Sequence, residues 1–325
     1  MLSEVIKLYR DRKDVTLTTY VLDDSKETRA GAPRPAVVIC PGGAYLNCSD
    51  REAEPMAMKF LSMGYHAFVL RYSVYSKGGF DEIDYKKPFE KKEECLYPAQ
   101  IRELGMTMNL LRDNADKWHI NKDQIAICGF SAGAHNCAMY SVYWNKPIVS
   151  DFVGVDAEKL RPNAMILGYP LTDYTFMKTT MGDDVIAKGL FSMSNIAFLG
   201  ETDPADDKLL EISPAKLVND AVPPTFIWAT ANDELVPVQH SLLFASSLAD
   251  AKIPYEMHIY EDGSHGLSAA DQTSASAQRE CRPLIQPWVD TAFAWLQQRF
   301  AYQIPEKNAM DIMMEEIQKQ QLQQA

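Results

Sequence analysis

Residues 124–133 read QIAICGFSAG, and this stretch decides the interpretation of the whole chain. The run 124–130 is apolar and ends at a turn, which is typical of a β-strand buried on both faces. Residues 129–133 (GFSAG) have the G-x-S-x-G pattern of a nucleophile elbow, a tight strand-to-helix turn that exposes the hydroxyl of Ser131 above a sheet. The following residues, 132–144, favour a helix, as the motif requires. The alternative is a strand–helix turn that needs its glycines for packing alone.

The alternation of strand and helix extends to both sides of this stretch. Short apolar runs bounded by turn residues predict further strands at 15–22, 36–40, 66–72, 164–169, 225–230 and 255–260. Apolar residues at helical spacing predict further helices at 53–63, 99–118, 238–250 and 284–299. Strands that alternate with helices form a mostly parallel sheet with helices on both faces, the α/β class. The strand at 15–22 is expected on an antiparallel edge of this sheet.

The length of 325 residues fits one large domain, and we predict a single domain over residues 1–325. Residues 172–224 separate two predicted strands by far more than the roughly twelve residues that a crossover needs, which predicts a small helical cap. Residues 301–325 form a polar tail with one apolar stripe, expected to pack on its own domain or on a partner subunit of a homo-oligomer. The stripe consists of Met310, Met313, Met314 and Ile317.

The composition excludes several classes of protein. Apolar residues make up 46% and charged residues 23% of the chain, which argues against a disordered protein. The net charge of −12 disfavours nucleic acid as a partner. No uninterrupted apolar run approaches the length of about 18 residues that indicates a membrane span. The N-terminal sequence is charged and the six cysteines lack CxxC spacing, so we expect the reducing cytoplasm rather than secretion.

A serine hydroxyl is a weak nucleophile and needs a general base, for which His265 is the best candidate. It lies in a loop after a predicted strand, between Gly263 and Gly266, and comes late in the chain, as the order serine, acid, histidine requires. The alternative is a histidine that only stabilises this loop. The remaining histidines fall within or beside predicted strands and helices and are interpreted as structural: His66, His119, His135, His240 and His258.

The acid that orients such a histidine is expected directly after a strand at the same edge of the sheet. Asp233 follows the strand at 225–230 in the loop ANDELVP and is the preferred candidate. Asp173 follows the strand at 164–169 and is its rival.

A second glycine turn, residues 41–45 (PGGAY), follows the strand at 36–40. Backbone N–H groups of Gly42 and Gly43, together with that of Ala132 after the nucleophile, are predicted to form an oxyanion hole. One such donor lowers a reaction barrier by about 2.7–4 kcal/mol. Which two N–H groups within 42–44 take part is left open, and an ordinary glycine turn is the alternative.

Taken together, GFSAG, PGGAY, ANDELVP and the base loop GSHGL resemble the α/β-hydrolase fold. More narrowly, the chain resembles the bacterial esterase/lipase family that includes acetyl esterases and acetylxylan or feruloyl esterase-like sugar hydrolases. Residues 49–55 (SDREAEP) share this resemblance, which covers about residues 15–300. The chain departs from the lipase pattern at Pro41, where histidine is common, and at Ala44, where glycine is common.

The resemblance implies hydrolysis of carboxylic esters with short, chiefly acetyl, acyl groups through an acyl-enzyme, and it does not fix the alcohol part. The favoured substrates are esters of sugars or of small xylo-oligosaccharides. This chemistry needs no metal and no organic cofactor. The cap and Tyr45 beside the oxyanion turn are expected to leave little room for a long acyl chain. Two alternatives remain open: a peptidase or amidase related to oligopeptidases or aryl-formamidases, and a non-catalytic binding protein on the same scaffold.

Overall fold

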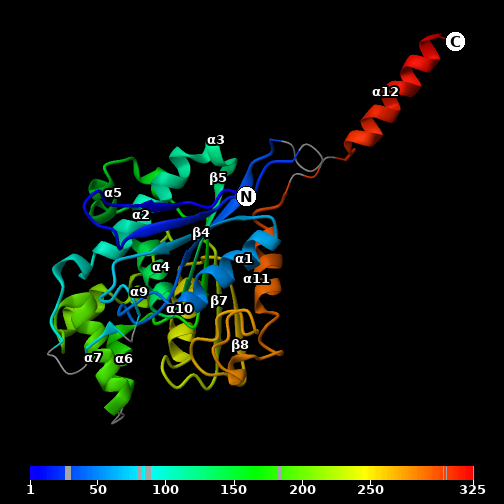
Figure 1. Ribbon diagram of the computed structural model, residues 1–325. Coiled ribbons are helices and arrows are strands. Elements are labelled where there is room, and N and C mark those ends of the chain that lie inside the picture. The colour runs from blue at the N-terminus through cyan, green and yellow to red at the C-terminus, as the bar shows by residue number, and fades with distance from the viewer. Residues whose placement is uncertain are drawn as a thin grey trace.

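One mixed β-sheet forms the centre of the computed structural model (Figure 1). The structure describes residues 1–25, 31–79, 82–84, 89–181, 185–302, 304 and 306–324. Within these residues, eight strands lie side by side in the order β1-β2-β4-β3-β5-β6-β7-β8. Their bounds are β1 (Val5–Lys7), β2 (Thr16–Tyr20), β3 (Arg34–Cys40), β4 (His66–Arg71), β5 (Ile120–Phe130), β6 (Ala164–Gly168), β7 (Thr225–Thr230) and β8 (Tyr255–Tyr260).

The direction of the strands follows the predicted pattern. β2 is antiparallel to β1 and to β4, whereas every pairing from β4 to β8 is parallel. The sheet is therefore mostly parallel with an antiparallel edge, as predicted, although the short strand β1 and not β2 is outermost.

Helices cover both faces of the sheet, which explains the uninterrupted apolar runs in the sequence. One face packs against α2 (Ala99–Asp113), α4 (Ala132–Tyr143) and α10 (Gln239–Asp250), and the other against α1 (Glu54–Ser62) and α11 (Trp288–Gln297) (Figure 1). Successive residues of a strand point to opposite faces. In β3, for example, Val38 belongs to the first apolar cluster and its neighbours Val37 and Ile39 to the second.

The parallel strands end at one edge of the sheet, and this edge carries the candidate residues. β3 leads into the turn 41–45, β5 into Ser131, β7 into Asp233 and β8 into the loop of His265. Because all these strands run in the same direction, residues far apart in the sequence meet there.

The segment 172–224 is helical, as predicted. It contains α6 (Tyr174–Thr180), α7 (Val185–Leu199), α8 (Asp206–Glu211) and α9 (Pro214–Leu217). α6 and α7 lie together beyond the carboxyl ends of the strands, at the lower left of Figure 1. In that position they can cover whatever binds at the end of the sheet.

Several predicted bounds are wrong for local reasons. The helix predicted at 99–118 is divided at Asn114 into α2 and α3 (Ala115–Trp118). β5 begins at Ile120, before the predicted residue 124, because Ile120 already pairs with Arg34 of β3. The helix predicted at 284–299 begins only at Trp288, after Pro287. The helix α5 (Pro147–Val153) was not predicted.

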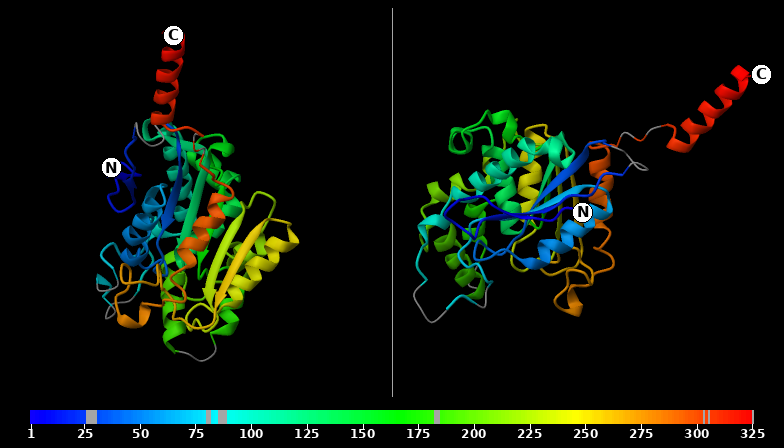
Figure 2. Two further views of the ribbon diagram at one scale, coloured as in Figure 1. Left: turned by 90° about the vertical axis from the view of Figure 1, so that its right-hand side faces the viewer. Right: turned by 45° about the horizontal axis from the view of Figure 1, so that its top comes forward.

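The tail contains α12 (Ala309–Gln324), which points away from the rest of the chain in every view (Figures 1 and 2). Its stripe is exposed, with Met310 61% and Met313 46% accessible, so α12 does not pack on its own domain. At the start of the tail, by contrast, the hydroxyl of Tyr302 donates to the carbonyl of Met63 at 3.0 Å. Packing on a partner subunit stays a prediction. Over the residues that the structure describes, no helix is both long enough and apolar enough to cross a lipid bilayer.

Candidate active site

Ser131 occupies a strained turn between β5 and α4. Its backbone has φ 50° and ψ −119°, in the left-handed half of conformational space that L-residues seldom adopt. The neighbouring glycines make the turn possible: a Cβ on Gly129 would lie 2.3 Å from the carbonyl oxygen of Gly133, and one on Gly133 would lie 2.0 Å from that of Cys40. The motif therefore has the geometry of a nucleophile elbow, with the N-terminal dipole of α4 beside the serine.

The structure brings together the three side chains that the sequence singled out. His265 Nε2 lies 2.8 Å from Ser131 Oγ, and His265 Nδ1 lies 2.7 Å from Asp233 Oδ2. Asp233 is only 7% exposed, and its other carboxylate oxygen accepts the N–H groups of Leu235 and Val236, each at 2.9 Å. With Nδ1–H directed to the carboxylate, Nε2 is left to accept the proton of the serine hydroxyl.

Asn232 links the loop of Asp233 to the loop of His265 by hydrogen bonds, and the sequence analysis did not single it out. Its side-chain oxygen accepts the N–H of Gly263 at 2.8 Å, and its amide donates to Asp262 at 2.6 Å. Thr230 adds a hydrogen bond to the carbonyl of Gly263 at 2.7 Å. Its position directly before Asp233 was the one feature of the sequence that could have pointed to Asn232.

Asp173, the rival acid, has a different role in the structure. It is the N-cap of α6, where its Oδ1 accepts the N–H of Phe176 at 2.9 Å and the hydroxyl of Thr175 at 2.6 Å. Its Oδ2 lies 3.2 Å from Lys216 Nζ. Both carboxylate oxygens of Asp173 therefore have partners other than His265.

Three of the other histidines are buried and hydrogen-bonded within the fold. His66 accepts the N–H of Leu22, and His240 accepts the N–H groups of Thr172 and Asp173. His135 lies between the hydroxyl of Tyr45 and the carbonyl of Ile212. Burial lowers the pKa of each of these three imidazoles to about 4, so they are neutral at pH 7.

The glycine turn requires one correction to the predicted oxyanion hole. The N–H of Gly42 donates to Glu52 Oε2 at 2.7 Å and is not available to a substrate, so Gly42 does not fit the predicted role. Within the described residues, the N–H groups of Gly43, Ala44 and Ala132 meet no hydrogen-bond acceptor. Gly43 has φ 129°, and a Cβ there would lie 2.3 Å from Asn47, so only glycine fits.

Tyr45 fixes the end of this turn from inside the protein. His135 Nε2 donates to the carbonyl of Ile212 at 2.7 Å, so Nδ1 accepts the hydroxyl proton of Tyr45 at 2.5 Å. The ring of Tyr45 stacks on Phe198 of α7, with centroids 4.0 Å apart. Tyr45 is 1% exposed and does not line the cavity, so the expectation that it narrows the acyl space is wrong.

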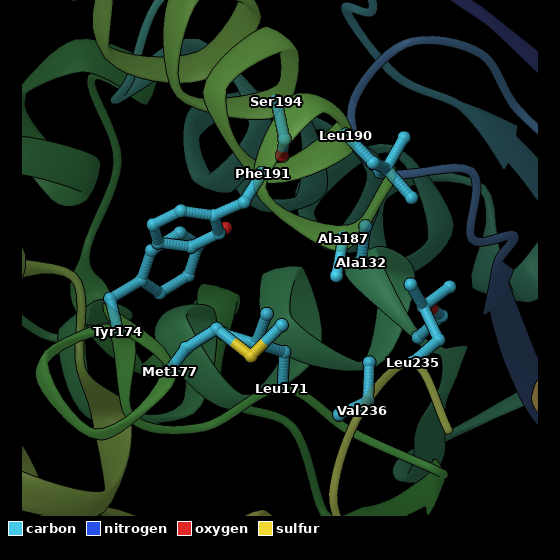
Figure 3. Close-up of a pocket in the computed structure, with 12 residues that line it drawn as sticks. Ala132, Leu171, Tyr174, Met177, Ala187, Leu190, Phe191, Ser194, Leu235 and Val236 are labelled. Carbon is cyan, nitrogen blue, oxygen red and sulfur yellow. The ribbon is translucent and has the colours of Figure 1, made fainter. Parts of the chain in front are cut away.

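A small apolar cavity opens beside Ser131 and Ala132 (Figure 3). Figure 3 shows the side chain of Met177 pointing into it, with the rings of Tyr174 and Phe191 at one end. Its volume is about 50 Å³. The cavity is small compared with the roughly 300–1,000 Å³ of pockets that bind a drug-sized ligand. Its remaining walls are Ala44, Leu171, Ala187, Leu190, Ser194, Leu235 and Val236.

A serine at a strand–helix elbow, with its histidine and acid on loops after later strands of a mostly parallel sheet, defines an α/β-hydrolase. The chain belongs to the BD-FAE family, whose model matches residues 22–248.

Relatives in sequence and in structure agree with this assignment. The chain is 32% identical to endo-1,4-beta-xylanase B of Butyrivibrio fibrisolvens over 244 residues, which cover 73% of this chain and 33% of that protein. It is 26% identical to the acetylxylan esterase of Xylanibacter ruminicola, over 71% of this chain and 41% of that protein. The crystal structure of the carboxylesterase Cest-2923 from Lactobacillus plantarum superposes with a TM-score of 0.74 at 26% identity, covering 92% of this chain and 98% of that one. The chain thus spans less than half the length of these two curated relatives.

Proposed function

We propose that the protein hydrolyses short-chain carboxylic esters, with Ser131 as nucleophile, His265 as general base and Asp233 as orienting acid. The observation that carries this proposal is the unbroken hydrogen-bonded series from Ser131 Oγ through His265 to Asp233, beside a cavity. In the first step the serine oxygen forms a bond to the ester carbonyl carbon while its proton moves to His265 Nε2. The bond to the alcohol oxygen then breaks, and the alcohol leaves with that proton.

The second step reverses the first with water. His265 takes a proton from water, the hydroxide oxygen bonds to the acyl carbon, and the bond to Ser131 Oγ breaks as the serine regains a proton. Both steps pass through a tetrahedral oxyanion. The N–H of Ala132, with that of Gly43 or Ala44, can donate to it. Ala132 and Ala44 line the same cavity as the nucleophile, and none of these three N–H groups meets another acceptor among the described residues.

The size of the cavity supports a short acyl group. A small apolar cavity beside the nucleophile favours an acetyl or propionyl group over an octanoyl chain. For the alcohol part we propose a sugar or small xylo-oligosaccharide, because the curated relatives bear the names of a xylanase and an acetylxylan esterase.

The first test compares Ser131→Ala with Ser150→Ala, a control on α5 outside the cavity, on p-nitrophenyl acetate. We expect Ser131→Ala to lose about 10⁶-fold in kcat, the size known for removal of a serine nucleophile, and the control to keep its activity. A fluorophosphonate probe should label the wild type and the control but not Ser131→Ala. Retention of a tenth of the activity by Ser131→Ala contradicts the proposal, and an unlabelled, inactive wild type indicates a binding protein.

A second test concerns the substrate. Release of acetate from acetylated xylo-oligosaccharides is compared with hydrolysis of p-nitrophenyl acetate and of p-nitroacetanilide, the matching amide. We expect the two esters to be cleaved and the anilide to be left intact. Faster cleavage of the anilide would favour the amidase alternative, and no acetate release from the sugar esters would leave only the simple esters as substrates.

A further inference from the structure

A buried carboxylate lies directly behind the glycine turn. Glu52, in the 3₁₀ turn Asp50–Glu52, is only 4% exposed. Its Oε2 accepts the N–H of Gly42 at 2.7 Å, and its Oε1 accepts the hydroxyl of Tyr169 at 2.6 Å. A Cβ built on Gly42 would lie 2.9 Å from both Glu52 Oε2 and Ser131 Cβ. Glu52 and the nucleophile therefore flank the same glycine.

The second contact of Glu52 leads to the general base. Tyr169 follows β6 with φ 38°, a strained backbone conformation. Its hydroxyl accepts the N–H of Ser268, three residues after His265, at 3.0 Å. Its ring packs edge-on against the imidazole of His265, with centroids 4.9 Å apart. One carboxylate thus connects the glycine turn with the loop of the base.

Stability alone does not explain a carboxylate in this place. Burial raises the pKa of Glu52 above its ordinary value, and the hydrogen bonds from Tyr169 and Gly42 offset this only in part. The guanidinium of Arg51 is directed elsewhere, to the carbonyl of Ser274 at 2.7 Å and to Glu280 at 3.0 Å. A buried carboxylate whose direct partners are neutral donors contributes less to folding than a well-packed apolar side chain would.

We propose that Glu52 is a positioning residue of this site, which orients the oxyanion turn and the loop of His265 relative to Ser131. The inference rests on the hydrolysis proposed above. By accepting the N–H of Gly42 on the buried side, Glu52 leaves the next N–H groups, those of Gly43 and Ala44, for the oxyanion, and Ala44 lines the cavity. Through Tyr169 it also sets the place of the imidazole. It acts through these groups and does not touch the substrate.

The main test is Glu52→Gln, which keeps the shape but cannot accept both hydrogen bonds in the same way. We expect kcat on p-nitrophenyl acetate to fall about 10- to 100-fold with KM within about threefold, because loss of one complete oxyanion donor lowers kcat about 10²- to 10³-fold. A trifluoromethyl ketone that forms a tetrahedral adduct with Ser131 should lose affinity by the same factor as kcat/KM.

Glu280→Gln is the matched control. Glu280 is also a buried carboxylate, 7% exposed, but its partners lie outside the site: it pairs with Arg51 and accepts hydrogen bonds from Ser276 and Ala277. We expect this variant to change the midpoint of thermal unfolding and to leave kcat within about twofold, since its carboxylate contacts neither the turn nor the base.

Tyr169→Phe provides a second variant that keeps the ring and removes only the hydroxyl. We expect a smaller fall in kcat, about three- to tenfold. The double variant Glu52→Gln, Tyr169→Phe should be no slower than Glu52→Gln alone, because both changes remove the same hydrogen bond between Tyr169 and Glu52. If Glu52→Gln does not fold, Tyr169→Phe decides, and an unchanged kcat there overturns the inference.

A folded Glu52→Gln enzyme with the kcat of Glu280→Gln also overturns it. That result leaves the proposed function intact if Ser131→Ala is inactive. Activity in Ser131→Ala would instead refute the proposed function itself.

Discussion

The loops after β6 and β7 begin alike and make different contacts. Each strand ends close to a buried aspartate, Asp173 at 1% and Asp233 at 7% exposure, whose carboxylate accepts backbone N–H groups of its own loop. Asp173 uses its second oxygen for Lys216, whereas Asp233 uses it for His265. The loop after β6 then leads into the helices over the cavity. A carboxylate at the end of a strand is therefore not defined as the catalytic acid by its position, but by the partner that the next loop brings to it.

The largest expected effect separates the two aspartates by activity. Asp233→Asn should lower kcat about 10⁴-fold, because an amide at this place favours the wrong tautomer of His265. Asp173→Asn should change kcat by less than about threefold, since its carboxylate contacts none of the reacting groups. Steady-state kinetics on p-nitrophenyl acetate give both values. The reverse ranking would assign the acid to the loop after β6.

The next effect concerns the cavity wall that the loop after β6 provides. Met177 of α6 points into the cavity, and Met177→Ala removes about three non-hydrogen atoms from it. Each added methylene that becomes buried contributes about 0.8 kcal/mol, or roughly fourfold in kcat/KM. We expect the ratio of butyryl to acetyl ester hydrolysis to rise about tenfold.

The control for this change is Met181→Ala. Met181 is the C-cap residue directly after α6, and it does not line the cavity. Its chain-length profile on p-nitrophenyl esters from acetyl to dodecanoyl should match the wild type. A wild-type maximum at eight carbons or more would refute the short-acyl proposal, and an unchanged profile in Met177→Ala would show that α6 does not set the acyl length.

Much of the candidate site could be predicted from the sequence. The elbow, the acid loop and the base loop each have a local signature, because a strand followed by a tight turn demands small residues near the functional side chain. The strands were predictable for a similar reason, since burial on both faces leaves an uninterrupted apolar run. The choice between Asp173 and Asp233 rested on order along the chain, and the structure now places only Asp233 against His265.

The roles of Glu52 and Tyr45 could not be predicted, because they depend on contacts between segments that are distant in the sequence. Glu52 meets Gly42 and Tyr169, 10 and 117 residues away, and no local pattern specifies such a meeting. One signal was present: Glu52 stands at helical spacing from Met56 and Phe60, both of which are buried, so a carboxylate on that side was anomalous. The same limitation applies to Tyr45, whose direction is set by His135 and not by its neighbours in sequence.

A smaller effect tests the role of Asp173 in stability. As the N-cap of α6 it accepts a backbone N–H, and removal of such a cap lowers stability by about 0.5–2 kcal/mol. We expect Asp173→Ala to lower the free energy of unfolding in urea by about this amount at pH 7 while kcat stays within about threefold of the wild type. A variant as stable as the wild type would show that the cap contributes nothing.

The smallest effect is the dependence of this stabilisation on pH. Burial alone would raise the pKa of Asp173, but the hydrogen bonds from Thr175 and Phe176 and the charge of Lys216 outweigh it and hold the pKa below its ordinary value. A carboxyl group whose pKa is lowered by folding stabilises the protein above its unfolded pKa, about 3.9, and loses this contribution as the pH falls through the lower folded value. The difference in unfolding free energy between wild type and Asp173→Asn should therefore be constant from pH 7 to about pH 5 and shrink below about pH 4, because a protonated aspartate resembles asparagine. Urea unfolding of both proteins at pH 7, 5, 4 and 3.5 measures this difference, which includes the effect of the Asp173 charge on the pKa of the neighbouring His240. A difference that stays constant down to pH 3.5 would mean that the charge of Asp173 plays no part in capping α6.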